Sequence, residues 1–299
     1  MKFLATCLSA KLRFMEFHTL IDVDSLQELL GGPRLAIVDC RFDLMNPEAG
    51  KQAYLRAHIP GARYADLDRD LSAPVGPRTG RHPLPVPAAF ANRLGAMGIG
   101  DDAQVIAYDE ANGSLAARLW WMLRWLGHGA VAVLDGGFKA WTARGGALES
   151  GQPTFRPGHF TPRVGANDVA QAVLGSAELE LALRDSKTLL VDARAAERYA
   201  GTVEPIDSVA GHIPGAVNHP FTGNLAADGR FLPAAELKRR WQERLGNADA
   251  ANLIVMCGSG VTACHNLLSL EVAGLTGGKL YAGSWSEWIR DPRRPVVRG

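Results

Sequence analysis

The stretch from Leu253 to Leu268 reads LIVMCGSGVTACHNLL. Its apolar start predicts a buried strand, the glycine-rich residues predict a tight loop that opens on Cys257, and the remainder predicts a helix. In such a loop, backbone N–H groups and the N-terminus of the following helix favour a negative charge on the cysteine sulfur. The stretch therefore predicts a strand, loop and helix that hold a reactive thiolate.

The chain contains a second copy of this unit. Blocks of similar sequence recur in the same order at a spacing of roughly 150 residues, which is the signature of a duplicated domain. In the first copy, Asp109 occupies the position that corresponds to Cys257. The matched blocks are VDCR at 38–41 and VDAR at 191–194, HIPGA at 58–62 and at 212–216, the apolar runs 105–108 and 253–256, and the closing segments 134–141 and 280–288.

Within the first copy, short apolar runs alternate with helical patterns. Such alternation predicts an α/β fold with a mainly parallel sheet flanked by helices, once in each of two tandem domains. In sheets of this kind, ligands bind beyond the carboxyl ends of the strands, where Asp109 and Cys257 fall. The expected elements are a helix over 24–30 stopped by Gly31-Gly32-Pro33, strands at 35–38, 105–108 and 131–134, and a helix over 115–126.

These patterns divide the chain into four parts. Residues 1–16 are expected to be a disordered tail or an extension upstream of a start at Met15, because their apolar part is short for a signal peptide. A non-catalytic domain follows over 17–145, then a Gly- and Pro-rich linker over 146–165, then a catalytic domain over 166–299. The polar, Pro-rich segment 72–85 predicts a long functional loop that can reach the other domain.

Composition excludes several classes of protein. The 299 residues are 47% hydrophobic and 21% charged, with a net charge of +1. We expect neither nucleic-acid nor membrane partners, since there is no basic stripe and no apolar run of about 20 residues. The four cysteines are few and irregularly spaced, which indicates a reducing compartment and a cytoplasmic location. Their spacing gives no metal site, so no zinc is expected.

The tandem HIPGA motifs, the CGSGVT loop and the segment Gly-Ser-Trp-x-x-Trp at 283–288 resemble the rhodanese superfamily. The resemblance extends over residues 17–296 and is greatest to the two-domain thiosulfate and 3-mercaptopyruvate sulfurtransferases, which need no cofactor. It implies that Cys257 takes sulfur from a small-molecule donor as a persulfide. The sulfur then passes to a thiol such as thioredoxin or glutathione, or to cyanide, by double displacement.

The resemblance also implies roles for individual residues. The loop is neutral at Gly258 and Ser259, like that of the 3-mercaptopyruvate branch, whereas thiosulfate enzymes carry basic side chains there. By motif match, Ser259 moves protons to the carbonyl end of the donor, His82 is its partner and Asp68 orients the histidine. A solvated loop position is the alternative for His82.

The donor's carboxylate requires a cation, and Arg198 matches a family arginine in this role. The loop residues Gly258, Gly260, Val261 and Thr262 are expected to contact the donor. The family's second arginine precedes the second HIPGA motif, but segment 204–211 contains none. Arg118 or an arginine of segment 78–81 would have to replace it.

Three other functions are alternatives for this sequence. A thiosulfate:cyanide sulfurtransferase is favoured by the missing arginine and opposed by the neutral loop. A phosphatase would need an arginine where Ala263 stands. A non-catalytic sulfur carrier or binding module would not need to retain Cys257. Structural roles are expected for Cys264, in the core, for His58 and His212, in turns, and for Asp39 and Asp192, as loop anchors.

Overall fold

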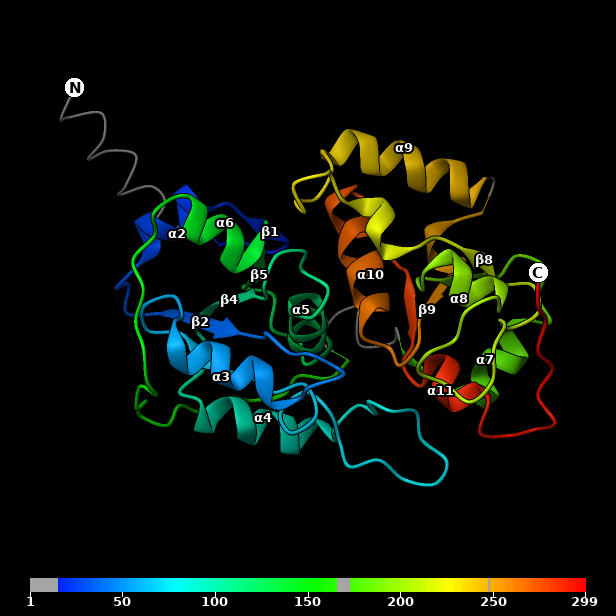
Figure 1. Cartoon of the computed structure of the whole chain (residues 1–299), viewed down its shortest axis with the longest axis horizontal. Coiled ribbons are helices and arrows are strands. Elements are labelled where there is room, and N and C mark those ends of the chain that lie inside the picture. The colour runs from blue at the N-terminus through cyan, green and yellow to red at the C-terminus, as the bar shows by residue number, and fades with distance from the viewer. Residues whose placement is uncertain (1–15, 166–172, 247) are drawn as a thin grey trace.

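The computed structural model describes residues 16–165, 173–246 and 248–299, which form two domains side by side (Figure 1). The N-terminal domain contains β1 (Leu20–Ile21), α2 (Val23–Leu29), β2 (Leu35–Asp39), α3 (Glu48–Arg56), β3 (Arg63–Tyr64), α4 (Pro87–Ala96), β4 (Gln104–Tyr108), α5 (Ala116–Trp125), β5 (Val131–Leu134) and α6 (Gly137–Ala143).

The C-terminal domain repeats this plan. It contains β6 (Val173–Leu174), α7 (Ser176–Ala182), β7 (Leu189–Asp192), α8 (Ala196–Ala200), β8 (Val217–Asn218), η2 (Phe221–Asn224), α9 (Ala234–Leu245), η3 (Ala250–Asn252), β9 (Leu253–Met256), α10 (Thr262–Val272), β10 (Lys279–Tyr281) and α11 (Ser284–Trp288).

Each domain is built on one five-stranded sheet, and both sheets have the same strand order. The orders are β1-β5-β4-β2-β3 and β6-β10-β9-β7-β8, and all of these neighbours pair in parallel. The α/β fold and the duplication predicted from the sequence are therefore confirmed. The expected elements differ from the observed ones by a residue or so at their ends, as hydrogen-bonded boundaries commonly do.

The repeated histidines have the structural role expected of them. His58 stacks on Tyr54 with ring centroids 4.2 Å apart, and its Nδ1 lies 2.8 Å from the Tyr54 carbonyl oxygen. His212 makes the same contacts with Tyr199, at 3.8 Å and 2.9 Å. Because the arrangement is the same in both copies, it belongs to the fold and not to the chemistry of one domain.

The repeated aspartates anchor loops, also as expected. Asp39 accepts a hydrogen bond of 2.6 Å from the Arg41 guanidinium, and Asp192 accepts one of 2.6 Å from Arg194. All four side chains are buried. Each arginine also donates to a backbone carbonyl of the loop that carries the repeated histidine, so the pair fixes the end of the second strand against that loop.

The two domains share part of their core. One continuous cluster of buried apolar residues includes Trp120 and Leu123 of α5 and Leu267 and Leu268 of α10. Figure 1 shows α5 and α10 facing each other at the centre of the molecule. Smaller clusters cover the opposite face of each sheet. Cys264 is fully buried in the shared cluster, as its expected core role requires, and apolar burial therefore stabilises the contact between the domains.

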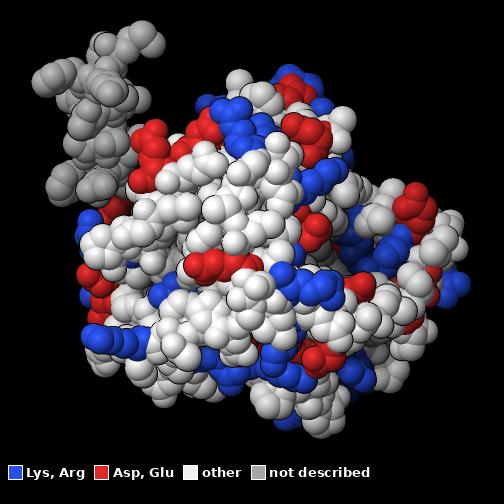
Figure 2. Space-filling view, turned by 60° about the vertical axis from the view of Figure 1, so that its left-hand side comes forward, with Lys and Arg blue, Asp and Glu red and all other residues white. Residues whose placement is uncertain are grey.

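The segment expected to link the domains lies along the N-terminal domain. Its backbone hydrogen-bonds to that domain through Gly158 N–H, 2.8 Å from the Gly95 oxygen, and Arg163 N–H, 2.7 Å from the Leu126 oxygen. The expected tail over 1–16 lies outside the described residues apart from Glu16. On the face shown in Figure 2, basic and acidic side chains are interspersed. Among the described helices, none has the length and apolarity to cross a membrane.

Candidate active site

Cys257 is the first residue after β9, in the loop that leads into α10. It is buried, with 2% of its surface exposed, and its Sγ accepts a hydrogen bond of 3.1 Å from Gly260 N–H. Gly260 has φ +76°, and a Cβ there would lie 2.3 Å from the Ala282 carbonyl oxygen. Only glycine satisfies both constraints, so this residue brings a backbone donor to the sulfur.

A second loop supports the cysteine from the other side. Ser284 has φ +54°, a left-handed conformation that costs a non-glycine residue about 1–3 kcal/mol. Its Oγ accepts the Cys257 N–H at 3.1 Å and donates to the Tyr281 carbonyl at 2.9 Å. In the other domain Gly137 takes the corresponding place, with φ +58°. Ser284 therefore adopts a strained backbone conformation that glycine would adopt without strain. Its hydroxyl in turn hydrogen-bonds to the backbone of Cys257.

The predicted Ser259, His82 and Asp68 lie in a row, although they come from two domains. Ser259 Oγ is 2.7 Å from His82 Nδ1, and His82 Nε2 is 3.2 Å from Asp68 Oδ1. Burial, with the charges of Arg118 and Arg81, lowers the pKa of His82 to about 3, so the ring is neutral near pH 7. The Asp68 carboxylate selects the tautomer with a proton on Nε2, which leaves Nδ1 to accept the Ser259 hydroxyl proton.

Arg118 connects the two loops that carry Ser259 and His82. It comes from α5, is fully buried, and donates from Nη1 to the Gly260 oxygen at 3.0 Å and from Nη2 to the His82 oxygen at 3.0 Å. A guanidinium bonded to backbone on both sides ties the cysteine loop to the His82 loop. Its described hydrogen bonds go to backbone oxygens of these two loops and of Leu71, and a role for it in binding the donor stays a prediction.

Two other arginines converge on the cysteine loop. A Cβ at position 258 would lie 2.8 Å from Arg81 Nη2, 3.5 Å from Arg198 Nη1 and 3.6 Å from Arg198 Nη2. Arg198 pairs with Glu204 at 2.8 Å and with Asp207 at 3.0 Å. Arg81 pairs with the other oxygen of Asp207. Gly258 therefore leaves space for two guanidinium groups next to Cys257.

The remaining loop residues lie at the start of the active-site helix. Val261 caps α10, and Thr262 is its first residue. This places the positive end of the helix dipole at the cysteine loop. Their contact with a donor, like that of Gly260, stays a prediction. In the described ranges, no group of three or more His, Cys, Asp or Glu residues is placed to hold a metal ion.

In the N-terminal domain, the corresponding loop is filled by its own carboxylate. Asp109 is buried and accepts backbone N–H bonds from Gly113 at 2.9 Å and Leu115 at 2.8 Å, with two longer bonds of 3.2 Å from Ala111 and Ala116. The loop amides thus surround an anion in this copy as well. The Asp109 carboxylate therefore takes the place in this loop that the Cys257 sulfur takes in the other domain.

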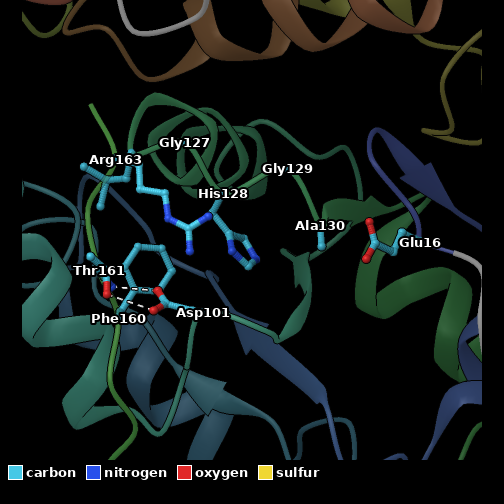
Figure 3. Close-up of a pocket in the computed structure, with 10 residues that line it drawn as sticks. Glu16, Asp101, Gly127, His128, Gly129, Ala130, Phe160, Thr161 and Arg163 are labelled. Atoms are coloured by element: carbon cyan, nitrogen blue, oxygen red, sulfur yellow. Dashed lines mark hydrogen bonds between the residues drawn. The ribbon is translucent and has the colours of Figure 1, made fainter. Parts of the chain in front are cut away.

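A separate hollow lies in the N-terminal domain at the opposite, amino-terminal edge of its sheet (Figure 3). Asp101 and Thr161 face each other there, and the Asp101 carboxylate accepts from Thr161 N–H at 2.7 Å and from its Oγ1 at 2.8 Å. His128 and Arg163 also line it. These bonds fasten the interdomain segment, and none of the predicted site residues lies there.

Sequence reasoning missed three residues of the site. Ser284 and Asp207 were not singled out, and Arg81 was included only as one member of segment 78–81. Ser284 left a signal, because the repeat aligns it with Gly137, at a position where a glycine would be expected. Asp207 and Arg81 gave no signal in the sequence. They form an ion pair although they are 126 residues apart in the chain, and no local sequence pattern indicates such a pair.

The comparisons with known proteins identify the family of the chain. The model of the rhodanese-like domain matches residues 22–144 and 176–291. The chain belongs to the rhodanese family, with two domains of this type in tandem. Within the family it is a sulfurtransferase of the 3-mercaptopyruvate or thiosulfate type.

One such relative is the probable 3-mercaptopyruvate sulfurtransferase of Pseudomonas aeruginosa, 51% identical over 95% of this chain and 100% of the relative. The thiosulfate sulfurtransferase of Rattus norvegicus is 35% identical, over 90% of each chain. Among solved structures, the 3-mercaptopyruvate sulfurtransferase of Leishmania major has a TM-score of 0.79 and 36% identity, over 91% of this chain and 74% of that one.

Proposed function

We propose that the enzyme takes sulfur from 3-mercaptopyruvate through a persulfide on Cys257. The observation that carries the proposal is the row of Ser259, His82 and Asp68 beside the cysteine loop. This row of side chains can transfer a proton. The reaction of 3-mercaptopyruvate requires a proton transfer to the leaving carbon, whereas the reaction of thiosulfate does not. The similarity to the Pseudomonas aeruginosa relative supports the same donor.

In the first half-reaction, the Cys257 thiolate attacks the sulfur of 3-mercaptopyruvate. An S–S bond forms, the C–S bond breaks, and its electron pair leaves with the three-carbon fragment as the enolate of pyruvate. The thiol proton of the donor is then transferred to the enolate carbon. Pyruvate departs, and a persulfide anion remains on Cys257, held by Gly260 N–H and the positive end of α10.

Ser259 and His82 provide the path for that proton. His82 Nδ1 accepts the Ser259 hydroxyl proton, so the Ser259 oxygen can accept a hydrogen bond from the donor thiol while its own proton stays within reach of the ring. Asp68 stabilises the positive charge on the ring whenever His82 holds a second proton. Burial of His82 makes that state brief, because it favours the neutral ring.

Thiosulfate would use this machinery differently. Its leaving group is sulfite, which departs as a stable anion and needs no proton on carbon. The cysteine loop offers thiosulfate no basic side chain of its own, since Gly258 and Ser259 are neutral. A row built to protonate a carbanion therefore favours the keto acid donor.

In the second half-reaction, the outer sulfur of the persulfide passes to an acceptor. A thiolate or cyanide attacks that sulfur, the S–S bond breaks, and the Cys257 thiolate is restored. Because Cys257 is almost fully buried, the acceptor atom must reach it through a narrow opening. Cyanide, and thiols such as glutathione or thioredoxin, are the acceptors that we expect.

The test compares kcat/KM for 3-mercaptopyruvate and for thiosulfate in the wild type, Cys257→Ser and Ser259→Ala, with exposed Ser186→Ala as the matched control. We expect Ser259→Ala to lower kcat/KM for 3-mercaptopyruvate by about 100-fold and that for thiosulfate by less than about 3-fold. Equal losses with both donors, or a wild type that prefers thiosulfate, would refute the proposed donor. Activity in Cys257→Ser would refute the persulfide.

A further inference from the structure

Arg118 and His265 occupy equivalent positions in the two copies of the domain. Arg118 lies on α5 and His265 on α10, and each is nine positions before the left-handed glycine that follows its helix, Gly127 (φ +83°) or Gly274 (φ +72°). Both side chains are fully buried. The two helices face each other where the domains meet (Figure 1). Each side chain is therefore placed to make the same kind of contact with the opposite domain.

The two side chains reach the same kind of acceptor across the interface. Arg118 Nη1 donates to the Gly260 oxygen at 3.0 Å. His265 Nε2 lies 3.0 Å from the Asn112 oxygen. Each acceptor lies three positions after the cysteine or after its aspartate counterpart. The contacts are therefore reciprocal, as in an interface between two copies related by a two-fold axis, and each helix holds the loop that precedes the other helix.

A buried network of polar side chains determines which nitrogen of His265 carries the proton. Asn224 Nδ2 donates to Asn266 Oδ1 at 2.7 Å and lies 3.3 Å from His265 Nδ1. Asn224 Oδ1 lies 3.0 Å from His219 Nε2. His265 Nδ1 is therefore an acceptor, and Nε2 carries the proton that it donates to the Asn112 oxygen. Burial lowers the pKa of His265 to about 3, so the ring is neutral near pH 7.

The loop that receives His265 is fixed from within and from the other domain. The Asp109 carboxylate accepts from Gly113 N–H at 2.9 Å, directly after Asn112. A Cβ on Gly113 would lie 3.2 Å from the Phe231 ring. That ring stacks on His265, with ring centroids 4.4 Å apart. The Asp109 loop is therefore a rigid receptor for α10.

The two side chains differ in charge, and the difference suits the loops that they contact. Arg118 is a cation: burial lowers its pKa, and the negative forms of Cys264 and Cys257 oppose that shift. A positive charge thus lies next to the loop that carries the reactive sulfur. The neutral His265 ring contacts a loop whose anion, Asp109, already accepts backbone N–H bonds and needs no further cation.

We propose that Arg118 and His265 form a reciprocal lock between the domains, and that His265 is a positioning residue for sulfur transfer. It acts through α10, which begins directly after the cysteine loop. With α10 held on Asn112, that loop keeps its place against Arg118 and against His82, both of which come from the other domain. The inference rests on the proposed role of Cys257 and not on the choice of donor. The N-terminal copy of the loop thus serves as the receptor that positions the catalytic one.

The test separates the hydrogen bond from the packing of the ring. His265→Gln keeps an N–H donor near the position of Nε2, whereas the amide of His265→Asn is one methylene shorter and does not reach Asn112. His265→Leu removes the polar atoms, and exposed His159→Leu is the matched control. For each protein, kcat and KM are measured with 3-mercaptopyruvate and with thiosulfate. Circular dichroism and the Tm establish that each variant is folded.

We expect His265→Asn and His265→Leu to lower kcat by about 10- to 100-fold with either donor, because the reacting groups are displaced from one another. KM should change by less than about 3-fold, since the loss is in the reaction and not in binding. His265→Gln should recover most of the kcat, and His159→Leu should change neither constant. In an Arg118→Met background, His265→Asn should lower kcat by less than about 3-fold more, because residues that hold one interface are coupled.

Full kcat in folded His265→Asn would overturn the inference, even if the Tm fell, because His265 would then only stabilise the fold. Equal kcat in His265→Asn and His265→Gln would also overturn it, since the Nε2 donor would not matter; this comparison decides the question if His265→Leu does not fold. Independent losses in Arg118→Met and His265→Asn would show two separate contacts and no lock. A wild type that prefers thiosulfate would refute the proposed donor and leave the lock intact.

Discussion

Replacing Gly260 by alanine tests how the loop controls the cysteine. Two costs arise at this position. The backbone has φ +76°, and the new Cβ would lie 2.3 Å from the Ala282 oxygen. Gly215 separates the two costs, because it has φ +78° in the same domain and nothing lies within 4 Å of its Cβ position. Gly215→Ala therefore carries the strain without the collision.

The magnitudes follow from these distances. The left-handed conformation costs alanine about 1–2 kcal/mol in either variant. Relief of the collision requires a shift of the loop by about 1 Å, which adds about 1–3 kcal/mol, as overpacking does. The same shift pulls Gly260 N–H away from Cys257 Sγ, now at 3.1 Å. Loss of one such donor lowers the rate by about 100- to 1,000-fold.

The assay pairs urea unfolding with sulfur transfer from 3-mercaptopyruvate. We expect Gly215→Ala to lose about 1–2 kcal/mol of stability and to keep its activity, whereas Gly260→Ala loses about 2–5 kcal/mol and at least about 100-fold in kcat/KM. If the two variants were equally active, the idea that the Gly260 amide holds the reactive sulfur would be wrong.

Two further predictions concern buried titratable side chains. Burial holds the pKa of His82 and of His265 at about 3, against about 6.5 in the unfolded chain, so the unfolded state binds more protons between these values. The stability is fully present above about pH 6.5 and is lost as the pH falls, by about 2 kcal/mol per histidine at pH 5; equal unfolding free energies in urea at pH 5 and pH 8 would contradict this. Asp109→Ala leaves its loop N–H groups without their carboxylate and is expected to lower the unfolding free energy by about 2–4 kcal/mol, with Asp109→Asn intermediate. A Tm of Asp109→Ala equal to that of the wild type would show that water replaces the carboxylate at no cost.

Much of the fold was predictable because its evidence is local. The central strands are short, fully buried apolar runs, and a parallel sheet requires helices between them. The edge strands β1, β3, β6 and β8 have two residues each, too few to form a pattern. The shared core at α5 and α10 was not predicted either, since an apolar helix face does not indicate which surface will cover it.

The nucleophile was predictable for the same reason. The loop after β9 has its cysteine, its glycines and its helix start within a few consecutive residues, and the N-terminal copy shows what the position becomes without a cysteine. Ser259, His82 and Asp68 were assigned by resemblance; the structure brings them within hydrogen-bonding distance of one another, and their roles stay predictions.

The sequence alone determined the duplicated α/β architecture and the position of the cysteine loop, because strand patterns and tight loops depend on neighbouring residues. Only the tertiary structure decided which side chains gather beside the cysteine loop. The pair of Arg81 and Asp207 joins positions 126 residues apart, and it exists because two domains pack so that one loop rests on the other. Contacts of this kind depend on the packing of whole domains, which no local pattern encodes.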